Sequence, residues 1–165
     1  NTIEKNIFFL KKEVLKNSIS EFNIVEKYSV KKIYPRELNI NIKPTKFIAK
    51  ISNKDDVLVG SNGKLISNKD FKKKLPSIFG KFNSNKFLEL KIHLERSGFN
   101  FEDLKSLIYF SSGRWDILTN DNVLIKLPNK KIYESLHLAK KILNDDNFKM
   151  NKFIDLRISN QIIVK

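Results

Sequence analysis

The most constraining feature of the sequence is the stretch from Leu104 to Leu127, where short apolar segments alternate with turn signals. The turn signals are Ser112-Gly113 and Asn120-Asp121-Asn122. The apolar residues that share one parity are Leu107, Tyr109, Trp115, Ile117, Val123 and Ile125. This alternation predicts a three-strand antiparallel meander with one buried face. Trp115, the only tryptophan, is expected in that core because an indole covers a large apolar area.

Two amphipathic patterns flank the meander, at residues 84–97 and 132–144. A sheet with one apolar face must bury it, and two helices at its margins are an economical cover. We expect Ser84 to cap the first helix and Gly98 to end it. These features predict an α+β fold.

The first third of the chain predicts a helix, a strand, a turn and a second strand. The helical spacing is that of Val14, Leu15 and Ile19. An extended run covers Ile24–Ile33, a turn follows at Tyr34-Pro35-Arg36-Glu37, and residues 38–43 alternate as a half-buried strand should. Pro44 cannot donate to a ladder, so it marks a bulge or a passage between sheets.

The charge of the chain favours a solvated lysine background over a nucleic-acid surface. The net charge is +14, but the lysines are scattered and acidic residues lie between them. Arginine is rare, and the four positions are Arg36, Arg96, Arg114 and Arg157. In such a chain an arginine indicates a site where the planar guanidinium fork is needed.

No pattern in the sequence indicates catalysis. The chain has no cysteine, and His93 and His137 lie on predicted helices away from any nucleophile. Ser111-Ser112-Gly113 lacks the glycines of a nucleophile elbow, and the paired aspartates lack metal-ligand spacing. We therefore predict no enzyme activity, no cofactor and no metal site.

Several short motifs follow one another along nearly the whole chain. They are Asn6–Leu10, Lys32–Ile40, Val57–Ile66, Leu75–Gly80, Ser112–Ile117 and Ile154–Arg157. In this order they resemble the FtsQ/DivIB family of bacterial cell-division proteins. The resemblance implies a truncated POTRA domain at residues 1–47, followed by a mainly antiparallel β domain flanked by two helices at residues 48–165.

The resemblance also implies where such a protein lies. Family members are single-pass proteins of the bacterial inner membrane, so this region is expected in the periplasm. Asn1 is then expected to fall inside the POTRA domain, after a membrane helix that this sequence does not include. Within the β domain, Asn62-Gly63 predicts a type I′ hairpin because both positions tolerate positive φ.

The function that the resemblance implies is a non-enzymatic scaffold of the divisome in septum formation. The expected partners are FtsB-like and FtsL-like proteins and other septal cell-wall synthesis proteins, with no nucleic acid. The expected mechanism is addition of a partner strand to the last strand of the chain. The predicted partner-binding residues are Arg114, Arg157, Ile158, Asn160, Gln161, Ile162 and Val164.

The sequence is also compatible with other interpretations. The last strand could instead close a hairpin with Ile162 and Val164 facing the core, and Arg114 could pair with Asp116. The exposed face of the first hairpin, Lys31–Arg36, is a second candidate surface. The other functional classes are a POTRA-containing outer-membrane assembly or secretion factor and a basic nucleic-acid-binding domain.

Overall fold

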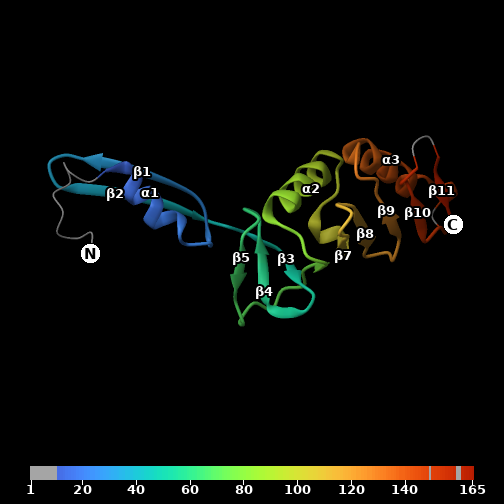
Figure 1. The fold of residues 1–165 in the computed structure, drawn as a ribbon, viewed down its shortest axis with the longest axis horizontal. Helices are drawn as coiled ribbons and strands as arrows, with labels where there is room; N and C mark the ends of the chain where they lie inside the picture. The colour runs from blue at the N-terminus through green and yellow to red at the C-terminus, as the bar shows by residue number, and fades with distance from the viewer. Residues whose placement is uncertain (1–10, 149, 159–160) are drawn as a thin grey trace.

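The structure is a computed structural model that describes residues 11–148, 150–158 and 161–165. The described residues form two sheets that lie along an elongated molecule (Figure 1). We call residues 11–44 the hairpin unit and residues 47–165 the sheet unit. Residues 45 and 46 connect the two.

The hairpin unit contains α1 (Lys12–Ser20), β1 (Val25–Ile33) and β2 (Glu37–Pro44), with the two strands antiparallel. The predicted order of helix, strand, turn and strand is confirmed. The prediction that the second strand is half-buried is wrong, because Ile40 and Ile42 are 40% and 54% exposed. Among the described residues only α1 accompanies this hairpin, and a helix of nine residues covers little of it.

Pro44 lies where the chain leaves one sheet for the other. It is the last residue of β2, and β3 (Phe47–Ile51) begins the large sheet three residues later. Pro44 pairs with Val25, and the register shifts between Val25 and Lys27. The predicted passage between sheets is therefore confirmed, with an irregularity beside it.

The sheet unit is built on one large sheet. In the described residues its strand order is β11-β10-β9-β8-β7-β6-β3-β4-β5. The remaining strands are β4 (Lys54–Gly60), β5 (Leu65–Ser67), β6 (Ser77–Phe79), β7 (Leu104–Tyr109), β8 (Trp115–Thr119), β9 (Leu124–Lys126), β10 (Phe153–Asp155) and β11 (Ile163–Val164). Neighbours are antiparallel except at β3–β6, β6–β7 and β9–β10, which are parallel. The predicted α+β class is confirmed.

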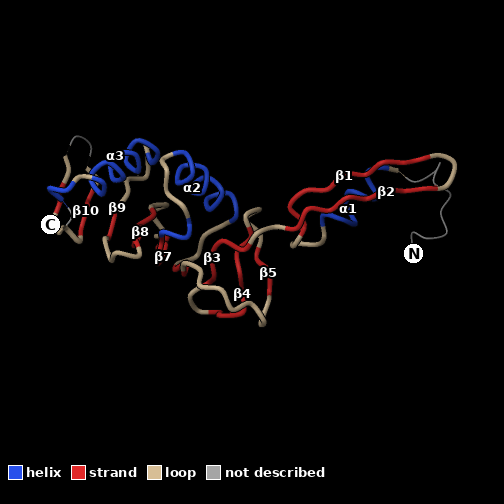
Figure 2. The backbone as a smooth tube through the Cα atoms, turned by 180° about the vertical axis from the view of Figure 1, so that it is seen from behind, coloured by secondary structure: helices blue, strands red, loops and turns tan. Residues whose placement is uncertain are grey.

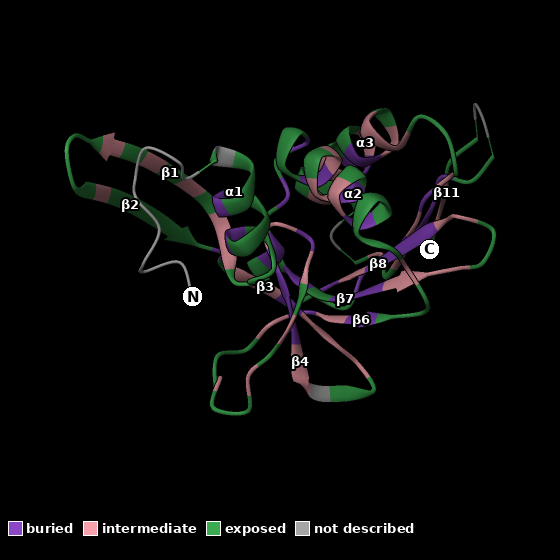
Figure 3. Ribbon diagram, turned by 60° about the vertical axis from the view of Figure 1, so that its left-hand side comes forward, coloured by how far each residue is buried: buried purple, intermediate pink, exposed green. Residues whose placement is uncertain are grey.

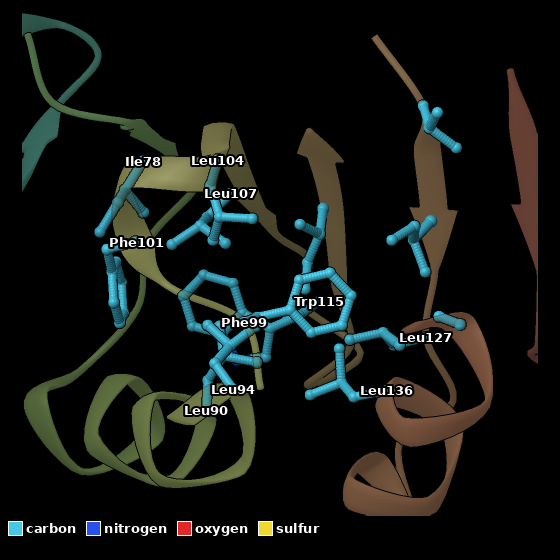
Figure 4. Close-up of a cluster of buried hydrophobic side chains, with 14 of the residues drawn as sticks. Ile78, Leu90, Leu94, Phe99, Phe101, Leu104, Leu107, Trp115, Leu127 and Leu136 are labelled. Carbon is cyan, nitrogen blue, oxygen red and sulfur yellow. The ribbon is translucent and has the colours of Figure 1, made fainter. Parts of the chain in front are cut away.

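The predicted meander is the centre of this sheet. β7, β8 and β9 are consecutive antiparallel strands, with Leu107 opposite Ile117 and Ile117 opposite Ile125. Trp115 is buried, and its ring lies 4.7 Å from that of Tyr109 and 5.9 Å from that of Phe82. Figure 4 shows it in the space between the strands and the helices.

The two predicted helices cover one face of the sheet (Figure 1; Figure 2). They are α2 (Ser84–Arg96) and α3 (Ile132–Asn144), and short 3₁₀ turns occur at Phe101–Asp103 and Asp146–Phe148. Gly98 follows the end of α2 with φ 81°, as predicted. The predicted cap is wrong by one residue, because Asn83 accepts the N–H of Lys86 while the Ser84 hydroxyl donates to the Gly63 carbonyl.

The predicted type I′ turn at Asn62-Gly63 is also wrong. β4 and β5 do form an antiparallel hairpin, but four residues separate them, and only Gly63 has a positive φ, of 75°. The Asn62 amide instead donates to the carbonyls of Asn23 and Val25, at 2.9 and 3.1 Å. A contact with the hairpin unit therefore fixes this loop.

Candidate partner-binding edge

β11 is the edge strand of the large sheet within the described residues. It pairs with β10 through Val164 opposite Ile154 and Ile163 opposite Asp155. Next to it, the N–H of Lys165 donates to the Phe153 carbonyl at 3.0 Å. The other side of β11 has no strand beside it among the described residues.

The structure places most of the predicted partner residues around one open hollow next to this edge. The hollow has a volume of about 790 Å³. The predicted residues that line it are Arg114, Arg157, Ile158, Gln161 and Ile162. Val164 packs against the core instead. This is the position that the closed-hairpin alternative predicted for Val164. Asn160 lies outside the described residues.

Apolar side chains are exposed on the C-terminal side of the hollow. Ile158 is 58% exposed and Ile162 is 45% exposed. Ile162 therefore does not face the core, in contrast to the closed-hairpin alternative. These two isoleucines are apolar surface near the edge strand.

Arg114 is held in place by two contacts on the turn between β7 and β8. Its Nε donates to Asp116 Oδ1 at 3.1 Å, and its guanidinium lies over the Phe110 ring at 4.2 Å. The local pairing with Asp116 is therefore present. Burial raises the pKa of Asp116, an effect that the nearby Arg114 charge only partly offsets. The guanidinium stands at the rim of the hollow beside a buried carboxylate.

Arg157 is held by a second aspartate. Its Nε and one terminal nitrogen donate to the two carboxylate oxygens of Asp155, at 2.8 and 2.6 Å. These hydrogen bonds hold the pKa of Asp155 below its usual range. The two arginines thus have fixed positions, which lowers the entropy that each would lose in binding a further carboxylate.

Three charged residues at the hollow were missed by the sequence interpretation. Lys130 and Lys131 precede α3, Glu134 lies in its first turn, and all three line the hollow. Lys131 has a left-handed backbone with φ 57°, which sets the entry into the helix. The Pro128-Asn129-Lys130-Lys131 run after a predicted strand was the available signal for a loop at this end of the sheet.

The other residues considered for chemistry lie apart from this hollow. Arg96 packs over the Tyr133 ring at 4.8 Å, and Arg36 is exposed in the turn between β1 and β2. His137 stacks on Tyr133, and His93 is half-buried on α2. In the described ranges no group of three or more His, Cys, Asp or Glu residues is arranged to hold a metal ion. None of the helices described has the length and apolar character needed to span a bilayer.

At one end of this α+β scaffold, an edge strand, two arginines that aspartates hold in place and two exposed isoleucines lie together. A family model described as cell division protein FtsQ/DivIB, C-terminal, matches residues 48–157. The chain therefore belongs to the FtsQ/DivIB family. None of the curated proteins matches it.

Membership of the family sets the general role of the protein. The FtsQ/DivIB proteins act in cell division as non-enzymatic scaffolds with partners in the division machinery. They are membrane-anchored and carry an extracellular domain. The predicted family is confirmed, and the division role follows from it.

Proposed function

We propose that this protein is a divisome scaffold that takes up a strand of an FtsB-like partner at β11 during septum formation. The observation that supports this most is the hollow that Arg114, Arg157 and Ile162 line, because Ile162 directly precedes β11, the edge strand of the sheet in the described residues. FtsL-like proteins and other septal cell-wall synthesis proteins are the further partners of this proposal.

In the proposed complex, the partner backbone pairs with the outer edge of β11. Main-chain hydrogen bonds supply affinity, and side-chain contacts supply specificity. The exposed Ile158 and Ile162 receive apolar side chains, and Gln161 offers an amide beside them. Arg114 holds an acidic side chain of the partner, and its pairing with Asp116 orients the guanidinium for that contact.

The domain organisation and the cellular position are part of the same proposal. Residues 1–47 form part of a POTRA domain, and residues 48–165 form the β domain. The separate sheet of the hairpin unit and a family match that begins at residue 48 support this division. The protein is anchored in the inner membrane by a single helix, and this region lies in the periplasm.

The test is a binding titration with an FtsB-like peptide on two variants. Arg114→Ala should weaken binding about tenfold, because a hydrogen bond to a charged group contributes roughly 1.5–3 kcal/mol. Ile162→Pro removes a main-chain donor near the edge. It should weaken binding if that N–H points outward and unfold the domain if it points inward. Circular dichroism measures whether each variant folds.

Arg96→Ala is the matched control, because Arg96 also packs on an aromatic ring but lies away from the edge. It should bind the peptide as the parent does. If Arg114→Ala and Ile162→Pro both fold and bind as tightly as the parent, the partner site is elsewhere. The exposed turn of the hairpin unit, Lys31–Arg36, is then the next surface to test.

The other two functional classes make different predictions. An outer-membrane assembly or secretion factor is disfavoured because the family match is to a cell-division protein. A nucleic-acid-binding role would require a sequence-selective complex with duplex DNA at physiological salt. A lysine background alone gives weak, unselective binding that falls steeply with salt.

A further inference from the structure

Besides the charged residues of the hollow near β11, a group of lysines lies toward the opposite end of the large sheet. The loop between β5 and β6 carries Lys69, Lys72, Lys73 and Lys74, which are four of the six residues from 69 to 74. We call residues 69–74 the basic loop. Its lysines line a hollow of about 500 Å³. The other lining residues are Lys50, Asp56, Leu58, Phe71 and Leu75.

The basic loop is anchored to the sheet unit at both ends. The Phe71 ring meets the Phe47 ring edge to face, with 5.2 Å between centroids and an 82° angle. Before it, the N–H of Asn68 donates to the Asp56 carbonyl at 2.8 Å. After it, Pro76 is buried. The lysines are therefore presented from a backbone whose position packing already fixes.

The basic loop holds four lysines against one carboxylate, Asp70, so its charge is only partly compensated. Within the described residues, Lys69, Lys72, Lys73 and Lys74 make no hydrogen bond and no ion pair. Asp56 is the one carboxylate among the described lining residues, and it accepts a hydrogen bond from Ser67. On α2, by contrast, lysines pair with glutamates, as Lys91 does with Glu95 at 3.0 Å. Clustered ammonium groups repel one another, and a bound anion relieves that repulsion.

The chemistry of the hollow fits phosphate. Lysine ammonium groups bind phosphate oxygens as point charges, and they need no planar fork to do so. The hollow is large enough for a phosphate-bearing headgroup. The family is membrane-anchored, so the domain stays beside a bilayer, where headgroups are at high effective concentration.

We propose that the basic loop binds the phosphate headgroups of an anionic lipid bilayer. This site is separate from the proposed partner edge, because β5 and β11 are the two ends of the large sheet (Figure 1). The scaffold would then contact the membrane surface with one end of its sheet and its protein partner with the other.

The test is co-sedimentation of the chain with vesicles of phosphatidylglycerol and phosphatidylcholine. We expect binding to the anionic vesicles, no binding to vesicles of phosphatidylcholine alone, and weakening as salt is added. Replacing Lys69, Lys72, Lys73 and Lys74 together by Gln should reduce the partition coefficient about tenfold or more, since each lysine near an anionic surface contributes several-fold.

The matched control removes the same formal charge from the hairpin unit. Lys11, Lys16, Lys27 and Lys31 are exposed and are replaced together by Gln. This variant should keep most of the vesicle binding. Equal losses in the two variants would mean that net charge alone draws the protein to lipid, and would overturn the site.

Inorganic phosphate distinguishes the lipid surface from free phosphate. At constant ionic strength it should displace little protein from the vesicles, because the bilayer presents many headgroups at once. Full displacement by inorganic phosphate, or unchanged vesicle binding in the basic-loop variant, would contradict the proposal. Both outcomes leave the partner-edge titration unaffected.

Discussion

The hairpin unit and the sheet unit bury their apolar side chains to very different extents (Figure 3). In the sheet unit, Phe87, Leu107 and Ile117 have no exposed surface. In the described part of the hairpin unit, only Leu15 and Ile19 are buried among the large apolar side chains. Its exposed apolar residues are Val14, Phe22, Ile24, Ile33, Tyr34, Ile40 and Ile42. The sheet unit therefore has a core of its own, and the described hairpin unit has very little.

Polar contacts join the hairpin unit to the sheet unit. The Glu26 carboxylate accepts hydrogen bonds from the hydroxyls of Ser61 and Thr45. These contacts, that of Ser61 above all, hold the pKa of Glu26 below its usual range. The Lys64 ammonium donates to the Ser20 carbonyl at 3.0 Å, and Asn62 donates to two carbonyls of the hairpin unit. The comparison shows that one unit is held by apolar packing and the other largely by a polar junction.

The largest expected effect is the loss of Trp115. Trp115→Ala should lower the free energy of unfolding of the sheet unit by about 3–5 kcal/mol, through lost burial and a residual cavity. Ile42→Ala in the hairpin unit is the control. Because Ile42 is 54% exposed, it should change stability by less than about 0.5 kcal/mol. Denaturant titration measures both, and a loss below about 1 kcal/mol for Trp115→Ala would contradict the contrast in packing.

A smaller effect is expected at Gly60, where β4 meets the junction. A Cβ there would lie 2.6 Å from Asn62 Oδ1 and 2.7 Å from Thr45 Oγ1. Gly60→Ala should therefore displace the junction and cost about 1–3 kcal/mol, as overpacking does. Hydrogen exchange should show β1 losing protection while β8 keeps it.

Gly113→Ala is the comparison for this variant, because a Cβ at Gly113 meets nothing within 4 Å. Its φ of 83° still disfavours alanine, so some stability is lost in the sheet unit. Protection of β1 should not change. Loss of protection at β1 in both variants would show that the hairpin unit responds to the stability of the whole sheet.

Local patterns were sufficient to predict the centre of the fold. The meander follows from alternation between two turn signals, and its register places Ile117 opposite Leu107 and Ile125. The helix at residues 132–144 has the predicted bounds because its apolar spacing is regular. The parallel pairing of β6 with β7 and of β10 with β9 was not predicted, because strands that are far apart in the sequence leave no periodic signal of their pairing.

The errors share a long-range cause. Asn62-Gly63 satisfies the requirements of a tight turn, but the carbonyls of Asn23 and Val25 compete for its amide. Alternation in β2 predicted a buried face, but Leu38 is only partly buried and Ile40 and Ile42 are exposed, because α1 is too short to cover the hairpin. At the candidate edge, Arg114 and Arg157 could be predicted because arginine is rare in this lysine-rich chain. Lys131 could not be predicted, because only tertiary packing brings the start of α3 to the hollow.

The smallest expected effect tests whether the junction carboxylate supports the hairpin unit. At neutral pH, Glu26→Gln should weaken the hairpin unit by about 1 kcal/mol, because hydrogen bonds to a carboxylate are stronger than those to an amide. The folded-state pKa of Glu26 is lowered, so its contribution is present above the unfolded value of roughly 4.3 and is lost as pH falls through the folded value. The parent and the variant should therefore converge in acid. Hydrogen exchange of β1 across this pH range measures the difference.

Asp155→Asn is the control, since the pKa of Asp155 is also lowered but its partner Arg157 lies in the sheet unit. It should alter protection at β10 and leave β1 unchanged, whereas a difference at β1 that persists in acid for Glu26→Gln would show that the carboxylate charge does not hold the junction.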